Sequence, residues 1–116
     1  MENGINNATN FKNIGVNVFV GLWNWPPDPA LSALAAAGMP VISGGYAGST
    51  SEISHILSNP NANMVKAYQL YDEPDMPNTA AGCLPPSSLQ SMANADRNAD
   101  PTRPIHINFR VGCGDP

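Results

Sequence analysis

Four short runs rich in apolar and β-branched residues recur along the chain, and Pro, Gly or Asn residues separate them. Runs of this length and composition, bounded by residues that break regular structure, are typical of β-strands. The pattern therefore predicts four strands, at 15–23 (GVNVFVGLW), 40–43 (PVIS), 65–71 (VKAYQLY) and 105–109 (IHINF).

Between these runs the apolar residues change to helical spacing, in which positions i, i+3 and i+4 share one face. Asp28 is expected to cap the first helix and Gly38 to end it, and Ser49 with Glu52 forms a capping-box pattern for the second. Three helices are predicted, at 28–38, 49–59 and 85–100.

The alternation of strands and helices predicts an α/β fold of four parallel strands with three intervening helices, joined by right-handed crossovers. A doubly wound sheet and part of a (β/α)8 (TIM) barrel both fit this order. Gln69, His106 and Asn108 lie inside predicted strands, and inward positions near the carboxyl end of a barrel strand face the active site. No G-x-G-x-x-G follows the first strand, and no Walker A pattern occurs. The partial barrel is therefore favoured.

A complete barrel of this kind usually takes about 250 residues, and this chain has 116. The expected organisation is one incomplete barrel segment over 1–116, corresponding to barrel strands two to five, with a polar N-terminal segment at 1–13. Such a segment leaves sheet edges and an apolar face uncovered, so self-association through those edges and poor stability in isolation are expected.

Charge and hydropathy narrow the possible partners. Five Lys plus Arg against nine Asp plus Glu give a net charge of −4, and no basic run could neutralise a phosphate backbone, so nucleic acid is not expected. No apolar stretch approaches the roughly 20 residues that span a bilayer, so no membrane partner is expected. Residues 1–10 (MENGINNATN) lack a secretory pattern, and an extracellular location of the parent protein would need a leader outside this numbering.

Three carboxylates follow the third predicted strand, in the run Tyr71-Asp72-Glu73-Pro74-Asp75. Ligand sites of barrels and of open α/β sheets form at this carboxyl end of parallel strands. Strand alternation predicts Gln69, Tyr71 and Glu73 on one face, with Leu70 and Asp72 on the other. The alternative for Asp72 and Asp75 is structural, because acids after strands often cap the next segment or bind a loop amide.

The segments YQLYDEPD, ADPTRPIHINF and GVNVFVGLW together resemble the middle of glycoside hydrolase barrels of clan A. In that clan the fourth strand ends in Asn-Glu-Pro, whose Glu is the general acid/base, so the resemblance assigns this role to Glu73. Asp72 stands where the clan has Asn, and a carboxylate cannot donate a hydrogen bond as an amide does. The resemblance implies a carbohydrate substrate and no cofactor.

The resemblance also implies that the catalytic nucleophile comes from a seventh strand, which these residues do not contain. Glu2 lies in the polar N-terminal segment and Glu52 in a helix cap, so neither replaces it, and the chain alone is expected to turn over nothing. Two alternatives stay open. One is a metal-dependent barrel in which Asp72, Glu73, Asp75 and His106 hold a divalent ion, and the other is a non-catalytic carbohydrate-binding remnant.

Several further residues are candidate substrate contacts at the same rim. Aromatic rings after strands can stack on sugars, and polar strand residues can face a ligand; the substrate-binding candidates are Trp23, Asp72, Asp75, Tyr71, His106 and Asn108, with Trp25 and Tyr46 as weaker aromatic candidates. Cys83 and Cys113 both follow predicted strands, and they either pair as a disulfide or stay unrelated thiols.

Overall fold

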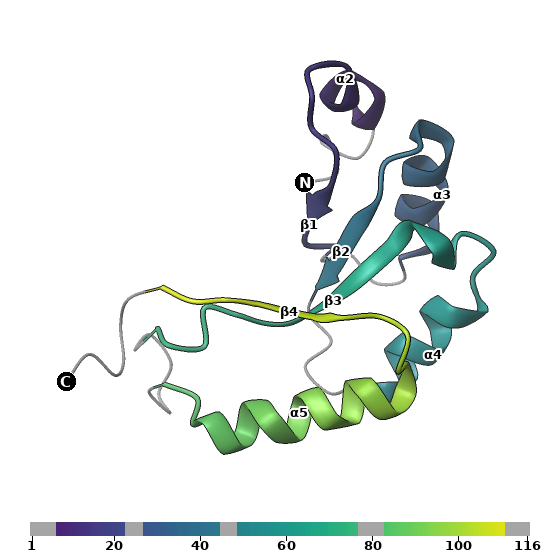
Figure 1. Cartoon of the computed structure of the whole chain (residues 1–116). Coiled ribbons are helices and arrows are strands. Elements are labelled where there is room, and N and C mark those ends of the chain that lie inside the picture. The colour runs from purple at the N-terminus through teal and green to yellow at the C-terminus, as the bar shows by residue number, and fades with distance from the viewer. Residues whose placement is uncertain (1–6, 23–26, 45–48, 77–82, 111–116) are drawn as a thin grey trace.

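The computed structural model describes residues 7–22, 27–44, 49–76 and 83–110, which build one four-stranded sheet with helices between the strands (Figure 1). Each strand pairs in parallel with the next one along the chain, in the order β1-β2-β3-β4. This confirms the predicted α/β class with four parallel strands. The strands are β1 (Phe19–Val20), β2 (Val41–Gly44), β3 (Val65–Asp72) and β4 (Ile105–Asn108).

The three predicted helices are present, and an additional one precedes the sheet. The helices are α2 (Ala8–Asn13), α3 (Asp28–Ala37), α4 (Thr50–Ser58) and α5 (Pro86–Ala99), with a 3-10 turn, η1 (Ala62–Met64), before β3. The predicted polar segment 1–13 therefore contains a helix, in which Ala8 is buried and Phe11 packs edge-on against Phe19. Among the helices of the described ranges, none has the length and apolar character needed to cross a membrane.

The predicted positions of the helix ends are confirmed, but two of the predicted capping interactions are not. Gly38 ends α3 with φ 61°, a left-handed conformation that glycine adopts at little cost. The predicted caps at Asp28 and Ser49 are wrong, because neither α3 nor α4 has a side-chain cap hydrogen bond. The Asp28 carboxylate instead contacts His55 and Asn59, and thereby ties α3 to α4.

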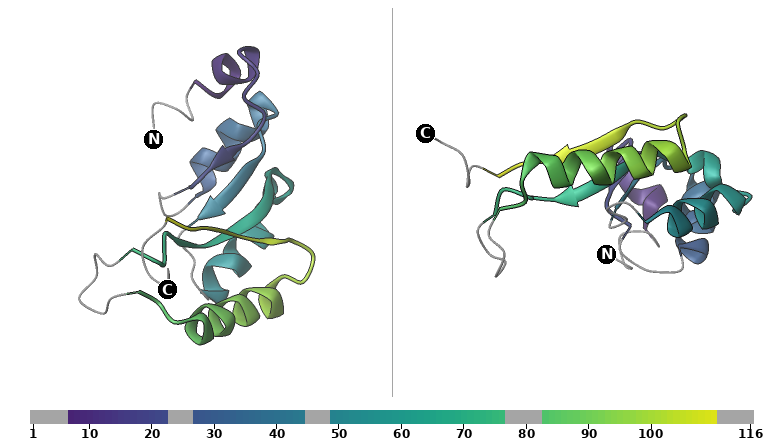
Figure 2. Two further views of the ribbon diagram at one scale, coloured as in Figure 1. Left: turned by 60° about the vertical axis from the view of Figure 1, so that its left-hand side comes forward. Right: turned by 90° about the horizontal axis from the view of Figure 1, so that it is seen from below.

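One face of the sheet is covered by helices. Tyr68 is buried in a cluster with residues of α3 and α4, and Leu70, two positions further along β3, packs toward α5. Residues two apart in a strand share a face, so α3, α4 and α5 lie on the same side of the sheet, as Figures 1 and 2 show. The sequential strand order lacks the reversal of a doubly wound sheet.

A buried polar cluster fastens the amino ends of β3 and β4. The Tyr68 hydroxyl donates to Asp100 at 2.9 Å, and Arg103 pairs with the same carboxylate. Arg103 also donates to the backbone oxygens of Val65 and Ala62, at 2.8 and 2.9 Å. The Asp100 carboxylate, which is 3% exposed, thus joins the loop before β4 to β3.

The same contacts shift the ionisation of Asp100. Burial alone would raise its pKa, but hydrogen bonds from Thr102, Arg103 and Tyr68 outweigh it and hold the pKa well below the ordinary value. Because the folded pKa is lowered, the ionised carboxylate stabilises the fold above the ordinary Asp pKa of about 4, and this stabilisation is lost as the pH falls below it.

We expect Asp100→Asn to lower the free energy of unfolding by about 3 kcal/mol at pH 7, because Arg103 would be left without its buried partner. The variant should also lose less stability on acidification than the wild type. Urea denaturation at pH 7 and pH 3 measures both effects. The control Glu52→Gln, which removes one negative charge from α4, should change stability by less than about 0.5 kcal/mol; equal effects of the two variants would contradict this account.

Candidate functional site

The carboxyl end of β3 departs from regular pairing, and this departure decides where Asp72 points. Gln69 pairs with His106 and Asp72 pairs with Asn108, so three steps along β3 match two steps along β4. The extra residue in β3 reverses the alternation of side chains beyond it. The predicted separation of Gln69 and Asp72 onto opposite faces is therefore wrong: both lie on the face away from α5.

A closed hydrogen-bonded triangle links these side chains on that face. Gln69 Nε2 donates to Asn108 Oδ1 at 2.9 Å and to Asp72 Oδ1 at 3.3 Å. Asn108 Nδ2 donates to the same Asp72 oxygen at 2.8 Å. One carboxylate oxygen thus accepts from amides of two neighbouring strands, which fixes the direction of the carboxylate.

The orientation of the Gln69 amide leaves its oxygen without a hydrogen-bond partner among the described residues. Gln69 is 3% exposed, and His106, at the paired position of β4, likewise has a buried Nδ1 without a hydrogen-bond partner in this part of the chain. Gly44 lies beside this oxygen, because a Cβ atom added to Gly44 would be 3.1 Å from Gln69 Oε1. A buried acceptor without a partner costs about 1–3 kcal/mol, and such exceptions in a folded protein are often found at functional sites.

Glu73 follows the triangle directly and leaves the strand conformation. Its φ is 47°, and it is the one non-glycine residue with positive φ in the described part of the chain. Its carbonyl accepts from Met76 at 3.0 Å, which closes a turn over Glu73 to Met76. Backbone strain of this kind, about 1–3 kcal/mol, gathers at active sites and ligand clamps. Strand alternation consequently does not determine the direction of the Glu73 side chain.

Asp75 makes the kind of contact expected of an acid that stabilises a loop, which is the alternative interpretation of this residue. Its Oδ1 accepts from the backbone N–H of Arg110 at 2.8 Å, which joins the turn to the chain beyond β4. The Cys83 sulfur lies 3.3 Å from the Asp75 carbonyl oxygen, and Cys83 is disulfide-bonded rather than a free thiol. Cys113, the partner that the sequence predicts, lies outside the described residues.

The other predicted site residues fall into two groups. Tyr71 and Asn108 are partly buried near the carboxyl ends of β3 and β4, His106 is partly buried within β4, and Asn108 joins the triangle. The aromatic candidates Trp23, Trp25 and Tyr46 lie outside the described residues. Within the described ranges, no group of three or more His, Cys, Asp and Glu side chains could hold a metal ion. The four predicted metal ligands are therefore not gathered into a metal site.

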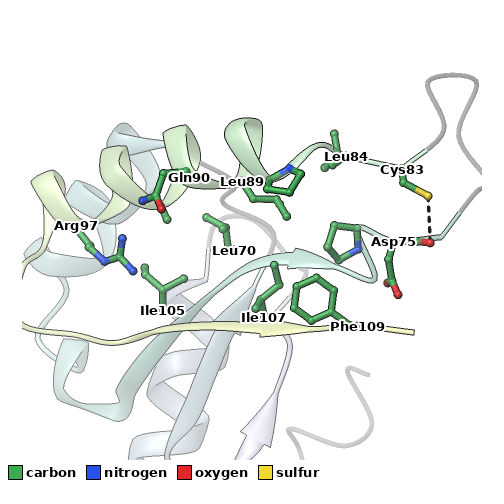
Figure 3. A pocket seen from close by; sticks show the side chains of 13 residues that line it. Leu70, Asp75, Cys83, Leu84, Leu89, Gln90, Arg97, Ile105, Ile107 and Phe109 are labelled. Carbon is green, nitrogen blue, oxygen red and sulfur yellow. Dashed lines mark hydrogen bonds between the residues drawn. The ribbon is translucent and has the colours of Figure 1, made fainter. Parts of the chain in front are cut away.

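A cavity of about 460 Å³ lies on the opposite face, between α5 and the strands β3 and β4 (Figure 3). Its walls are mainly apolar, with Leu70, Leu89 and Ile107 among them, and Asp75 stands at one end. Leu70 and Ile107 alternate with the polar residues of the triangle, so this cavity lies in the interface between α5 and the covered face of the sheet. We place the chemistry of the site on the polar face, where the carboxylate and the amides converge.

Gln69 is a member of the site that was not predicted as one. In the sequence it indicated only which face of the strand points inward. A glutamine in the middle of an otherwise apolar strand is itself a signal, because buried polar side chains need partners. The partners, Asp72 and Asn108, could not be inferred from spacing, since the extra residue in β3 is not evident in the sequence.

Comparison with protein family models, with curated proteins and with solved structures found no match to the chain. The function is therefore inferred from the site itself.

The conformation of Glu73 gives a direct test of the strain at this turn. We expect Glu73→Gly to be more stable than Glu73→Ala by about 0.5–1 kcal/mol, because glycine adopts positive φ without the cost of a Cβ. Chemical denaturation of the two variants measures the difference. A more stable alanine variant would show that the left-handed conformation at residue 73 is not strained.

Proposed function

We propose that this chain is part of a carbohydrate-active (β/α)8 barrel of the glycoside hydrolase type, in which Glu73 is the general acid/base. The observation that carries the proposal is the polar face of the sheet at the carboxyl ends of β3 and β4. In such barrels the helices lie outside, the polar inward residues line the ligand site, and catalytic groups follow strand ends. Gln69, Asn108 and Asp72 lie on the face away from the helices, and Glu73 follows the end of β3.

The sequential strand order supports the barrel in preference to other α/β architectures. Parallel strands added one after another, each by a right-handed crossover, place every helix on one side and leave the other face of the sheet for the barrel interior. Four strands are half of the eight that close such a barrel. The edges β1 and β4 would pair with strands outside these residues.

Asp72 in place of the clan's Asn is compatible with this proposal. The atom of Asp72 that holds the triangle together is Oδ1, an acceptor that an asparagine side chain also has. The scaffold contact is therefore the same for both residues. Only the second side-chain atom differs, as an acceptor in Asp and a donor in Asn.

The proposal predicts that Glu73 protonates the leaving group. In the full-length protein, we expect Glu73→Gln to lower kcat/KM by about 10²- to 10⁴-fold on glycosides with a poor leaving group. Aryl glycosides whose leaving group needs no proton should lose much less. Steady-state kinetics on both substrate types, with Glu52→Gln as the control, measure this difference, and an equal loss on both would argue against the acid/base role.

The sequence on either side of this chain in its gene tests the barrel itself. We expect one further strand–helix unit before it and three after it, with a Glu at the end of the seventh strand as the nucleophile. Gene sequencing answers the question. Flanking segments without strand–helix repeats would remove the barrel proposal.

A further inference from the structure

The acceptor pattern for N-linked glycosylation occurs once in the chain, at Asn7-Ala8-Thr9. The pattern is Asn, then any residue except Pro, then Ser or Thr, and a used site lies on the surface of an exported protein. Because so short a pattern also arises by chance, the structure around it and the compartment of the protein must both be considered.

The surroundings of Asn7 leave room for a bulky group. Asn7 is the N-cap residue of α2, and both Asn7 and Thr9 are exposed, whereas Ala8 between them is 2% exposed and belongs to the core. Asn7 Oδ1 accepts from Asn10 Nδ2 at 3.3 Å, so the nitrogen at the other end of the Asn7 amide is directed away from Asn10. A sugar chain on this nitrogen can extend into solvent while Ala8 keeps its place in the core.

The helix α2 lies far from the candidate functional site. Lys12 Nζ donates to the backbone oxygens of Ala37 and Gly38, at 3.2 and 3.1 Å, which lie just before β2. This contact places α2 at the amino ends of β1 and β2, as Figure 1 shows. The candidate site lies at the carboxyl ends of β3 and β4. A sugar chain at Asn7 therefore does not cover the site.

An independent observation concerns the compartment in which the protein folds. Cys83 is disulfide-bonded, and disulfides form and persist in oxidising environments such as the lumen of the endoplasmic reticulum and the cell exterior. N-linked glycans are added to proteins on this same export route. The disulfide and the acceptor pattern thus indicate the same route.

We propose that Asn7 carries an N-linked oligosaccharide in the exported protein. The donor is an oligosaccharide whose anomeric carbon is bound to a lipid pyrophosphate. A C–N bond forms between this carbon and Asn7 Nδ2, the C–O bond to the pyrophosphate breaks, the lipid pyrophosphate leaves with the electron pair, and Nδ2 releases one proton. Thr9 is the part of the pattern that the transferring enzyme recognises. This inference does not depend on the proposed carbohydrate function.

Mass spectrometry of the full-length protein from its natural source tests the proposal. Trypsin cleaves after Lys12 and releases a peptide that contains Asn7. We expect this peptide to be missing at its unmodified mass. After treatment with peptide N-glycosidase in H₂¹⁸O, it should appear with an ¹⁸O-labelled Asp at position 7. A peptide whose main form contains unmodified Asn7 would overturn the proposal.

Variants that are secreted from a eukaryotic cell separate the acceptor pattern from its neighbours. The wild type should show a larger apparent mass on a gel, which the glycosidase removes. Thr9→Ala keeps Asn7 but breaks the pattern and should lose this shift, whereas Thr9→Ser should keep it. The control Asn10→Gln changes the neighbouring exposed amide and should also keep the shift. A shift that persists in Thr9→Ala, or a secreted wild type without any shift, would contradict the assignment of Asn7.

Discussion

One oxygen of the Asp72 carboxylate, shared by the amides of Gln69 and Asn108, organises the polar end of this sheet. The extra residue in β3 brings Asp72 onto the face of Gln69, and the pairing of β3 and β4 resumes at Asp72 and Asn108, where both amides meet this oxygen. The turn at Glu73 begins immediately afterwards, with a left-handed backbone. The directions of the Gln69, Asp72 and Asn108 side chains are therefore fixed together through this oxygen.

The two faces of the sheet carry different chemistry because the helices cover only one of them. Leu70 and Ile107 meet α5 on the covered face, whereas Gln69 and Asn108 meet Asp72 on the other. At the opposite end of the strands, the Asp100 cluster fixes β3 to the loop before β4. Stabilising and candidate functional polar groups thus lie at opposite ends of the same strands, as they do in barrel enzymes.

Periodicity and breaker residues were sufficient to predict four parallel strands and the helices between them. The short helix α2 was not predicted, because its apolar residues, Ala8 and Phe11, lie among polar ones. Only the folded structure shows that Ala8 is buried and that Phe11 packs against Phe19. The face of Asp72 was predicted wrongly, since one inserted residue in a strand reverses alternation without a sequence signal. Asp28 also failed as a cap, because tertiary contacts with His55 and Asn59 engage its carboxylate.

The central claim is that a saccharide binds on the helix-free face, between the triangle and Glu73. A crystal structure of the full-length protein with a bound oligosaccharide tests it most directly. The account predicts a sugar group within hydrogen-bonding distance of Asp72 Oδ2 and the Glu73 carboxylate beside a glycosidic oxygen. A saccharide bound among the helices, or a Glu73 side chain directed into the helix layer, would contradict it.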